Sequence, residues 1–106
     1  MSDQDLEWML SMIGLARKAG RLIVGTPQVC GALPGGGVRL VLYSASASGN
    51  TKKRVLDRTA YYGVRAVALD ASPETLAARV GKTGAVAAVG VADTGFARAI
   101  EARAGY

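Results

Sequence analysis

The segment from Arg21 to Gln28 carries the residue types that bind a phosphate backbone. An apolar stretch ends at Gly25, and Thr26 and Pro27 then predict a helix start, with a hydroxyl cap and a proline at the first helical position. The free N–H groups of such a start favour an anion, and a glycine permits close approach of a ligand backbone. Gln28 has both a donor and an acceptor, so it could read the edge of a base. Many α/β proteins turn in this way, so the pattern alone has low specificity.

A second candidate lies at the predicted start of another helix. Its sequence is Asn50-Thr51-Lys52-Lys53-Arg54, which places three cations in a first turn where the helix dipole disfavours each by roughly 0.3–1 kcal/mol. A helix selected only for stability would carry acids there, and a local arrangement that costs free energy is typical of functional sites. A solvated basic surface without a ligand is the alternative interpretation, and the pattern leaves both open.

The charge distribution favours a polyanionic partner. Nine basic residues and one acid lie between positions 17 and 65, so this stretch has a net charge of +8 in a chain whose total is +5. The rest of the chain holds four basic residues and seven acids. Such segregation is expected of a protein that binds nucleic acid.

The residues that most enzymes use are missing or misplaced. The chain has no histidine, so nucleophile–histidine systems are absent. Asp70 and Asp93 follow predicted strands, where capping of turns and helices is the expected role. Gly81-Lys82-Thr83 has the ending of a phosphate loop, but Leu76 stands where that motif needs a glycine. The single Cys30 allows no internal disulfide and no metal-ligand spacing, so we predict a non-enzymatic protein without cofactor or metal.

The elements that would position these residues alternate between helix and strand. Helices are predicted over residues 5–19, from the Thr26 cap to Pro34, from a cap at Ser48 or Asn50 to residue 62, from a start at Ser72-Pro73-Glu74 to about residue 80, and from a cap at Asp93 or Thr94. Strands are predicted over residues 21–24, 38–43, 64–69 and 85–91. The last of these is continuously apolar, which is typical of a central strand. The alternation predicts an α/β fold, a three-layer α/β/α sandwich around a sheet of about four strands.

One domain is predicted over residues 1–106, because the length leaves no room for a second core and no linker or repeat is visible. The longest apolar run, residues 85–92, is shorter than the ~20 residues that span a bilayer. The acidic N-terminal segment lacks the positive charge of an export signal. We therefore expect a cytoplasmic protein without membrane contact, and we favour a monomer while the oligomeric state stays open.

At these positions the chain resembles the bacterial YlxQ-type members of a ribosomal superfamily, that of the L-seven-Ae and L-thirty-e proteins. The matching segments are residues 13–22, 25–29, 50–53, 61–64 and 89–97, in order along nearly the whole chain. The segment over residues 15–20 together with residues 50–53 is fairly specific for this family, whereas either segment alone has only modest specificity.

The resemblance implies a mixed four-stranded sheet enclosed by helices and binding to kink-turn RNA, ribosomal or other. In that family the junction of the first strand and second helix enters the kink, where backbone amides and a polar side chain meet tandem sheared G·A pairs. The matching positions are Gly25, Thr26, Pro27 and Gln28. The family's second contact region matches Asn50, Thr51 and Lys52, and the loop that covers a flipped-out nucleotide matches residues 80–83, including Lys82 and Thr83.

Departures from the family pattern keep other hypotheses open. Pro27 stands where relatives commonly carry Asn or Lys, Gly31 replaces a frequent Lys, and Val29 replaces a frequent Thr, which weakens the expected hold on RNA. Ser46 and Gly49 replace acids, which removes repulsion from phosphate. A protein-interaction adaptor that has lost specific kink-turn recognition is therefore the alternative to RNA binding. A small-molecule enzyme on the same sandwich is a third hypothesis, against which the missing catalytic residues speak.

Overall fold

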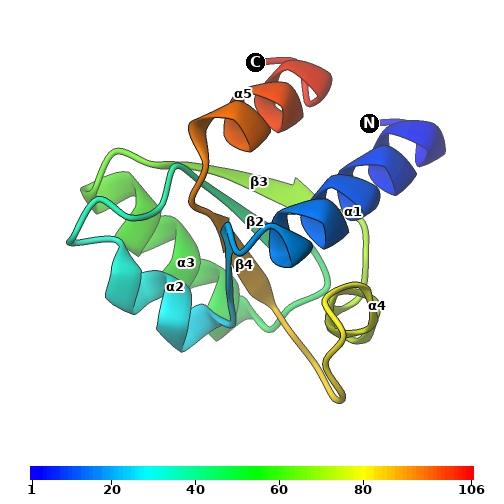
Figure 1. Cartoon of the computed structure of the whole chain (residues 1–106). Coiled ribbons are helices and arrows are strands. Elements are labelled where there is room, and N and C mark those ends of the chain that lie inside the picture. Colours follow the sequence, from blue (N-terminus) through cyan, green and yellow to red (C-terminus); the bar gives the residue numbers. More distant parts are fainter.

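Five helices and four strands alternate along the chain in the computed structural model, which describes residues 1–106 (Figure 1). In chain order they are α1 (Asp3–Lys18), β1 (Leu22–Val24), α2 (Thr26–Ala32), β2 (Leu40–Ser44), α3 (Gly49–Tyr61), β3 (Arg65–Leu69), α4 (Pro73–Arg79), β4 (Ala88–Val91) and α5 (Thr94–Arg103). None of the helices combines the length and the apolar composition that a membrane span requires.

The strands form one mixed sheet in the order β1-β4-β2-β3. β4 runs antiparallel to both of its neighbours, β1 and β2, whereas β2 and β3 are parallel. As a result β1, β2 and β3 end at the same edge of the sheet, and β4 begins there. We call this edge the carboxyl edge and the opposite one the amino edge. The starts of α2, α3 and α4 and the loop before β4 all lie at the carboxyl edge, because each directly follows or precedes a strand end there.

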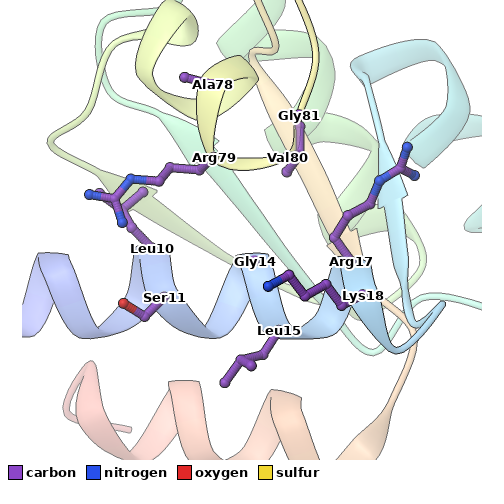
Figure 2. A pocket seen from close by; sticks show the side chains of 10 residues that line it. All are labelled: Leu10, Ser11, Gly14, Leu15, Arg17, Lys18, Ala78, Arg79, Val80 and Gly81. Atoms are coloured by element: carbon purple, nitrogen blue, oxygen red, sulfur yellow. The ribbon is translucent and has the colours of Figure 1, made fainter.

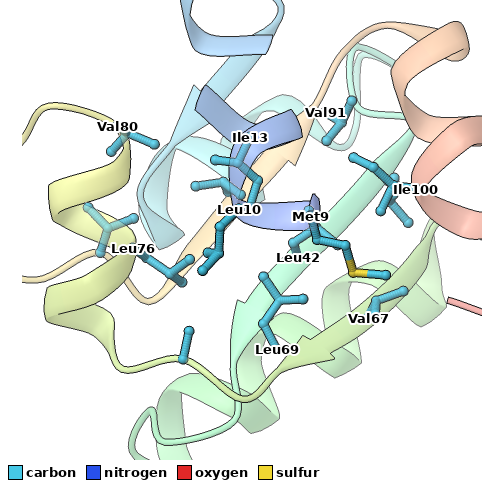
Figure 3. Packing of buried hydrophobic residues seen from close by; sticks show 14 of the residues in the cluster. Met9, Leu10, Ile13, Leu42, Val67, Leu69, Leu76, Val80, Val91 and Ile100 are labelled. Carbon is cyan, nitrogen blue, oxygen red and sulfur yellow. The ribbon is translucent and has the colours of Figure 1, made fainter. Parts of the chain in front are cut away.

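Helices cover both faces of the sheet, so the predicted α/β sandwich is confirmed. In β2, Leu40 and Leu42 face the larger core cluster, which α1, α4 and α5 cover, and Val41 faces the smaller one beneath α2 and α3. This alternation is the two-residue period of a strand with both faces buried. Met9 and Ile13 of α1 are fully buried against the sheet, and Figure 3 shows them among the side chains of the larger cluster.

Most helices begin at the caps that the sequence predicts. Ser48 accepts a hydrogen bond from the N–H of Thr51, so it is Ser48 and not Asn50 that caps α3. Ser72 caps α4, and Asp93, not Thr94, caps α5. These side chains satisfy backbone donors that have no partner within the helix.

The predicted cap of the second helix is wrong. Gly25 is the cap residue, at a φ of +103°, and no side chain accepts a hydrogen bond there. Thr26 is already helical, and Pro27 follows it as the second helical residue. The reason is the positive φ, which glycine alone adopts without strain and which turns the chain from β1 into α2 within a single residue.

All four strands begin later than predicted and are shorter. β1 begins at Leu22 instead of residue 21, and β3 begins at Arg65 instead of residue 64. β4 begins at Ala88 instead of residue 85, and β2 begins at Leu40 instead of residue 38. Before β4, the N–H of Val86 donates to the carbonyl oxygen of Pro73 at 2.9 Å, so this apolar residue packs beside α4 and not in the sheet. Periodicity alone cannot distinguish an apolar loop residue of this kind from a strand residue.

Candidate nucleic-acid interface

The junction of β1 and α2 is held from both sides and open to solvent at its tip. The N–H of Gly25 donates to the carbonyl oxygen of Ala88 at 2.9 Å, and the Gly25 carbonyl oxygen accepts from the N–H of Val29 at 2.9 Å. Gly25 is therefore tied both to the sheet and to the first turn of α2. Pro27 and Gln28 are exposed, so the predicted contact residues are accessible.

Two backbone donors at this junction have no partner. The N–H groups of Thr26 and Gln28 make no hydrogen bond within the protein, and Pro27 between them has no N–H. Free donors at a helix start are suited to a phosphate or another anion. The junction therefore offers two amide donors, one fewer than a helix start without proline.

The side chain of Gln28 folds back over Gly25. A Cβ atom built on Gly25 would lie 2.4 Å from Gln28 Oε1 and 3.2 Å from its Cδ. The carboxamide thus occupies the space that only glycine leaves free, directly above the junction. In this position it can present both a donor and an acceptor to a base edge that approaches the two free amides.

The three cations near the start of α3 do not all lie in its first turn, where the sequence predicts them. Because Ser48 caps the helix, the first turn runs from Gly49 to Lys52, and Lys53 and Arg54 lie in the second turn. The three side chains also have different surroundings. Lys52 Nζ donates to the carbonyl oxygen of Ala45 at 3.2 Å, and Lys53 Nζ pairs with Asp57 at 2.7 Å. The Asp57 carboxylate, which accepts the hydrogen bond from Lys53, raises the pKa of that lysine. Arg54 is exposed and makes no ion pair. Arg54 is thus the cation most available to a phosphate, and side-chain pairing of this kind cannot be read from a run of basic residues.

The loop before β4 is the third exposed segment at the carboxyl edge. Residues 81–85 are all exposed, and in Figure 1 the loop projects beyond the sheet. Its base is fixed, because the N–H of Lys82 donates to the carbonyl oxygen of Ala77 at 2.8 Å. The Lys82 side chain makes no ion pair, and Thr83 makes no side-chain hydrogen bond. Both predicted residues of this loop are therefore accessible.

The carboxyl edge brings most of the predicted site residues together. β4 lies between β1 and β2, and the N–H groups of Gly25 and Ser44 donate to consecutive carbonyl oxygens, those of Ala88 and Ala87. The predicted residues gathered at this edge are Gly25, Thr26, Pro27, Gln28, Asn50, Thr51, Lys52, Lys53, Lys82 and Thr83. Arg21 is the exception, because its carbonyl oxygen accepts from the N–H of Ala92 at the opposite end of β1.

The basic stretch between residues 17 and 65 does not form a single surface. Arg39 and Arg65 lie at the amino edge, just before β2 and at the start of β3. Arg65 also pairs with Glu101 at 3.5 Å and lies 3.9 Å from the centroid of the Tyr106 ring. A strand of five residues carries the chain about 15 Å across the sheet, so cations near in sequence are placed at opposite edges. The charge count therefore overstates the positive charge at the carboxyl edge.

The capping role predicted for Asp70 is wrong, because its side chain is exposed and makes no hydrogen bond, and Ser72 caps the helix that follows. Asp93 and Cys30 have structural roles. Asp93 accepts from the N–H of Phe96 at 2.8 Å, which confirms it as a helix cap. Cys30 is buried, as expected of a thiol that packs as a small apolar side chain.

Comparison with known proteins gives two curated relatives that match along most of the chain. An Enterococcus faecium protein named RNA-binding protein YlxQ is 33% identical over 98 residues, which cover 92% of each chain. A Bacillus subtilis (strain 168) protein of the same name is 35% identical over 92 residues, which cover 87% of this chain and 89% of the relative. No family model matches.

Solved structures show the same fold. A protein of unknown function from Bacillus halodurans C is 35% identical, with a TM-score of 0.82 over 90% of this chain and 94% of that one. The 15.5kD RNA binding protein of Giardia lamblia has a TM-score of 0.76 over 99% of this chain and 89% of its own, at 14% identity. Similarity at that low identity shows the fold alone.

Proposed function

The chain belongs to the YlxQ family of RNA-binding proteins, and from this membership we propose that it binds structured RNA through the carboxyl edge of its sheet. The family is named for binding RNA and not for a reaction. The whole of residues 1–106 would act as one RNA-binding domain, because β1 near the start of the chain pairs with β4 near its end.

The finer proposal is that the RNA is a kink-turn, with ribosomal RNA as its source. The observation that carries it is the convergence of three exposed segments at one edge: the β1–α2 junction, the start of α3 and the loop over residues 81–85. A sharply bent RNA can touch all three segments at once, whereas a straight duplex presents only one side of its backbone to such an edge.

Each segment would contact a different part of the RNA. The free N–H groups of Thr26 and Gln28 would receive a phosphate or base acceptor at the kink, and the Gln28 carboxamide would read a base edge. Lys52 and Arg54 would lie along the backbone as phosphate contacts. The exposed loop around Lys82 would cover a nucleotide displaced from the stack.

The test is a titration with a labelled kink-turn RNA and with a control of equal length in which the sheared G·A pairs are replaced by G·C pairs. We expect tighter binding to the kink-turn, because only that RNA presents the bent backbone and the sheared base edges together. Equal affinity for the two RNAs at the same salt concentration would contradict kink-turn recognition while leaving general RNA binding intact.

The competing function is a protein-interaction adaptor, and two observations on α2 favour it. Pro27 removes one amide donor from the junction, and Gly31 is exposed with no side chain to contact a phosphate. A pull-down with the full chain, before and after nuclease treatment, separates the two functions. Partners that survive nuclease support the adaptor, whereas loss of all partners supports RNA binding.

A further inference from the structure

A groove outside the proposed site lies between α1 and α4, on the face of the sheet opposite to α2 and α3 (Figure 2). Its volume is about 540 Å³, the larger of two cavities in the protein. Gly14 lies at its centre, and Val80 and Gly81 at the end of α4 form part of its opposite wall. The groove therefore opens directly beside the loop over residues 81–85, which the proposed function places on RNA.

The charges around the groove are positive and unpaired at the end near this loop. Arg17 and Lys18 are exposed and make no ion pair. Figure 2 shows Arg17 rising from α1 on the side of Gly81, and Lys18 extending back along α1 toward Gly14. The dipole of α1 accounts for cations in its last turn, but no carboxylate lines the groove to neutralise them.

At the other end of the groove, the lining residue Arg79 is in an ion pair with Glu7. Arg79 donates to both carboxylate oxygens of Glu7, at 2.7 and 2.8 Å. That pair leaves Arg79 neutralised and fixed, so the free positive charge of the groove is confined to Arg17 and Lys18. An anionic ligand would thus have a defined orientation, with its charge toward the loop over residues 81–85.

The middle of the groove is open because Gly14 has no side chain. A Cβ built there would meet only the carbonyl oxygen of Arg79, at an ordinary contact distance of 3.7 Å. A larger side chain at this position would therefore project into the groove. Leu15, which is exposed, contributes apolar surface beside it, whereas Leu10 and Val80 are buried beneath the groove. An apolar centre next to two free cations matches a nucleotide, whose base is apolar on its faces and whose phosphate is anionic.

We propose that this groove is a second RNA subsite, which takes an unpaired nucleotide next to the kink with its phosphate on Arg17 and Lys18 and its base over Gly14. The subsite rests on the proposed function, since it requires the same RNA to lie on the adjoining loop. Continuity with that loop favours RNA over an acidic peptide as the occupant.

The test compares two double variants that each remove two unpaired cations. Arg17→Gln with Lys18→Gln removes the groove charges, and Arg39→Gln with Arg58→Gln removes two exposed cations that lie outside the groove. The groove variant is expected to bind the kink-turn RNA about tenfold more weakly, with the salt slope reduced by about two. The matched variant is expected to stay within about twofold of the wild type, because its cations lie outside the proposed contacts.

A blocking variant tests the nucleotide itself. Gly14→Leu fills the groove without changing its charge and places a better helix former in α1. Hydroxyl-radical cleavage of the bound RNA should lose protection at the same unpaired nucleotide in this variant and in the Arg17/Lys18 variant. Thermal unfolding confirms that both variants fold.

The outcomes separate the subsite from the function on which it rests. Equal binding of the wild type to the kink-turn and the G·C control overturns kink-turn recognition. The subsite alone is overturned if the wild type prefers the kink-turn but the two double variants bind the kink-turn RNA with equal affinity. In that case the hydroxyl-radical footprint of the groove variants would also match that of the wild type. Capture of a protein through the groove after nuclease treatment also overturns it, because the groove would then be a protein-docking site.

Discussion

The hydroxyl group of Ser44, the last residue of β2, donates a hydrogen bond of 2.6 Å to the carbonyl oxygen of Ala71 in the loop between β3 and α4. The Ser44 hydroxyl oxygen also accepts a hydrogen bond of 3.1 Å from the N–H of Ser46, in the turn that leads to α3. Ser44 is fully buried. A single hydroxyl thus connects the start of α4 with the approach to α3, and it fixes two of the segments that meet at the carboxyl edge.

We expect Ser44→Ala to destabilise the protein. The substitution leaves the Ala71 carbonyl oxygen and the Ser46 N–H without their partner, which costs roughly 1–3 kcal/mol. Urea unfolding measures the loss as a lower midpoint at an unchanged slope. Ser11→Ala is the matched control, because Ser11 is exposed on α1 and makes no side-chain hydrogen bond. A change below about 0.5 kcal/mol in Ser44→Ala would show that the buried bond contributes little.

Gly25→Ala is expected to destabilise the β1–α2 junction for two separate reasons. Its φ of +103° strains any other residue by on the order of 1–3 kcal/mol, and its new Cβ would displace the Gln28 carboxamide. Gly31→Ala in the same helix is the control. Nothing lies within 4 Å of a Cβ there, so we expect a gain of up to about 1 kcal/mol from helix propensity. Thermal unfolding of the two variants should therefore shift in opposite directions.

Gln28→Ala is expected to weaken kink-turn binding by about 1–3 kcal/mol and to leave binding to the G·C control unchanged. The side chain lies above the two free amides of the junction, where only a specifically bent RNA would meet it. Titration of both RNAs with the variant measures the two affinities. An equal loss on both RNAs would show that Gln28 contacts the backbone and not a base.

Much of the fold follows from the sequence, and the reasons are local. The caps at Ser48, Ser72 and Asp93 are hydroxyl or carboxylate residues at the start of a helical pattern, and they form the predicted hydrogen bonds. The continuous apolar run ending at Val91 predicts the central β4, all of whose residues are buried. Alternation of strands and helices is enough to predict the sandwich.

The site is less predictable because it depends on strand direction and on side-chain pairing. Arg21 is only four residues before Gly25, yet the intervening strand places it at the opposite edge. Lys53 and Arg54 are equivalent in the sequence pattern, but only Lys53 meets a carboxylate. The groove beside Arg17 arises where α1 packs on α4, two helices far apart along the chain, and no local pattern indicates it.

Acid should destabilise the protein through Asp5. A hydrogen bond from Arg103, together with bonds from the Ser2 backbone and side chain, lowers the pKa of Asp5 from 3.8 to about 2. Because the folded pKa is the lower one, this stabilisation is present above about pH 4 and is lost as the pH falls toward 2. Unfolding curves of Asp5→Asn should therefore depend less on pH in that range. Asp3→Asn, whose carboxylate makes no ion pair, is the control and should retain the dependence of the wild type.

Asp57→Asn is expected to increase RNA affinity, and this result would separate paired from unpaired cations at α3. The substitution removes the carboxylate 2.7 Å from Lys53 Nζ, so it frees one positive charge at the carboxyl edge.

We expect Lys52→Ala and Arg54→Ala to lower affinity for the kink-turn and the G·C control alike and to reduce the salt slope by about one each. Lys53→Ala should have a smaller effect in the wild type than in the Asp57→Asn background, because in the wild type the carboxylate competes with phosphate for the same ammonium. Equal effects of Lys53→Ala in the two backgrounds would show that the exposed ion pair does not restrict Lys53, as is common for surface pairs of low energy.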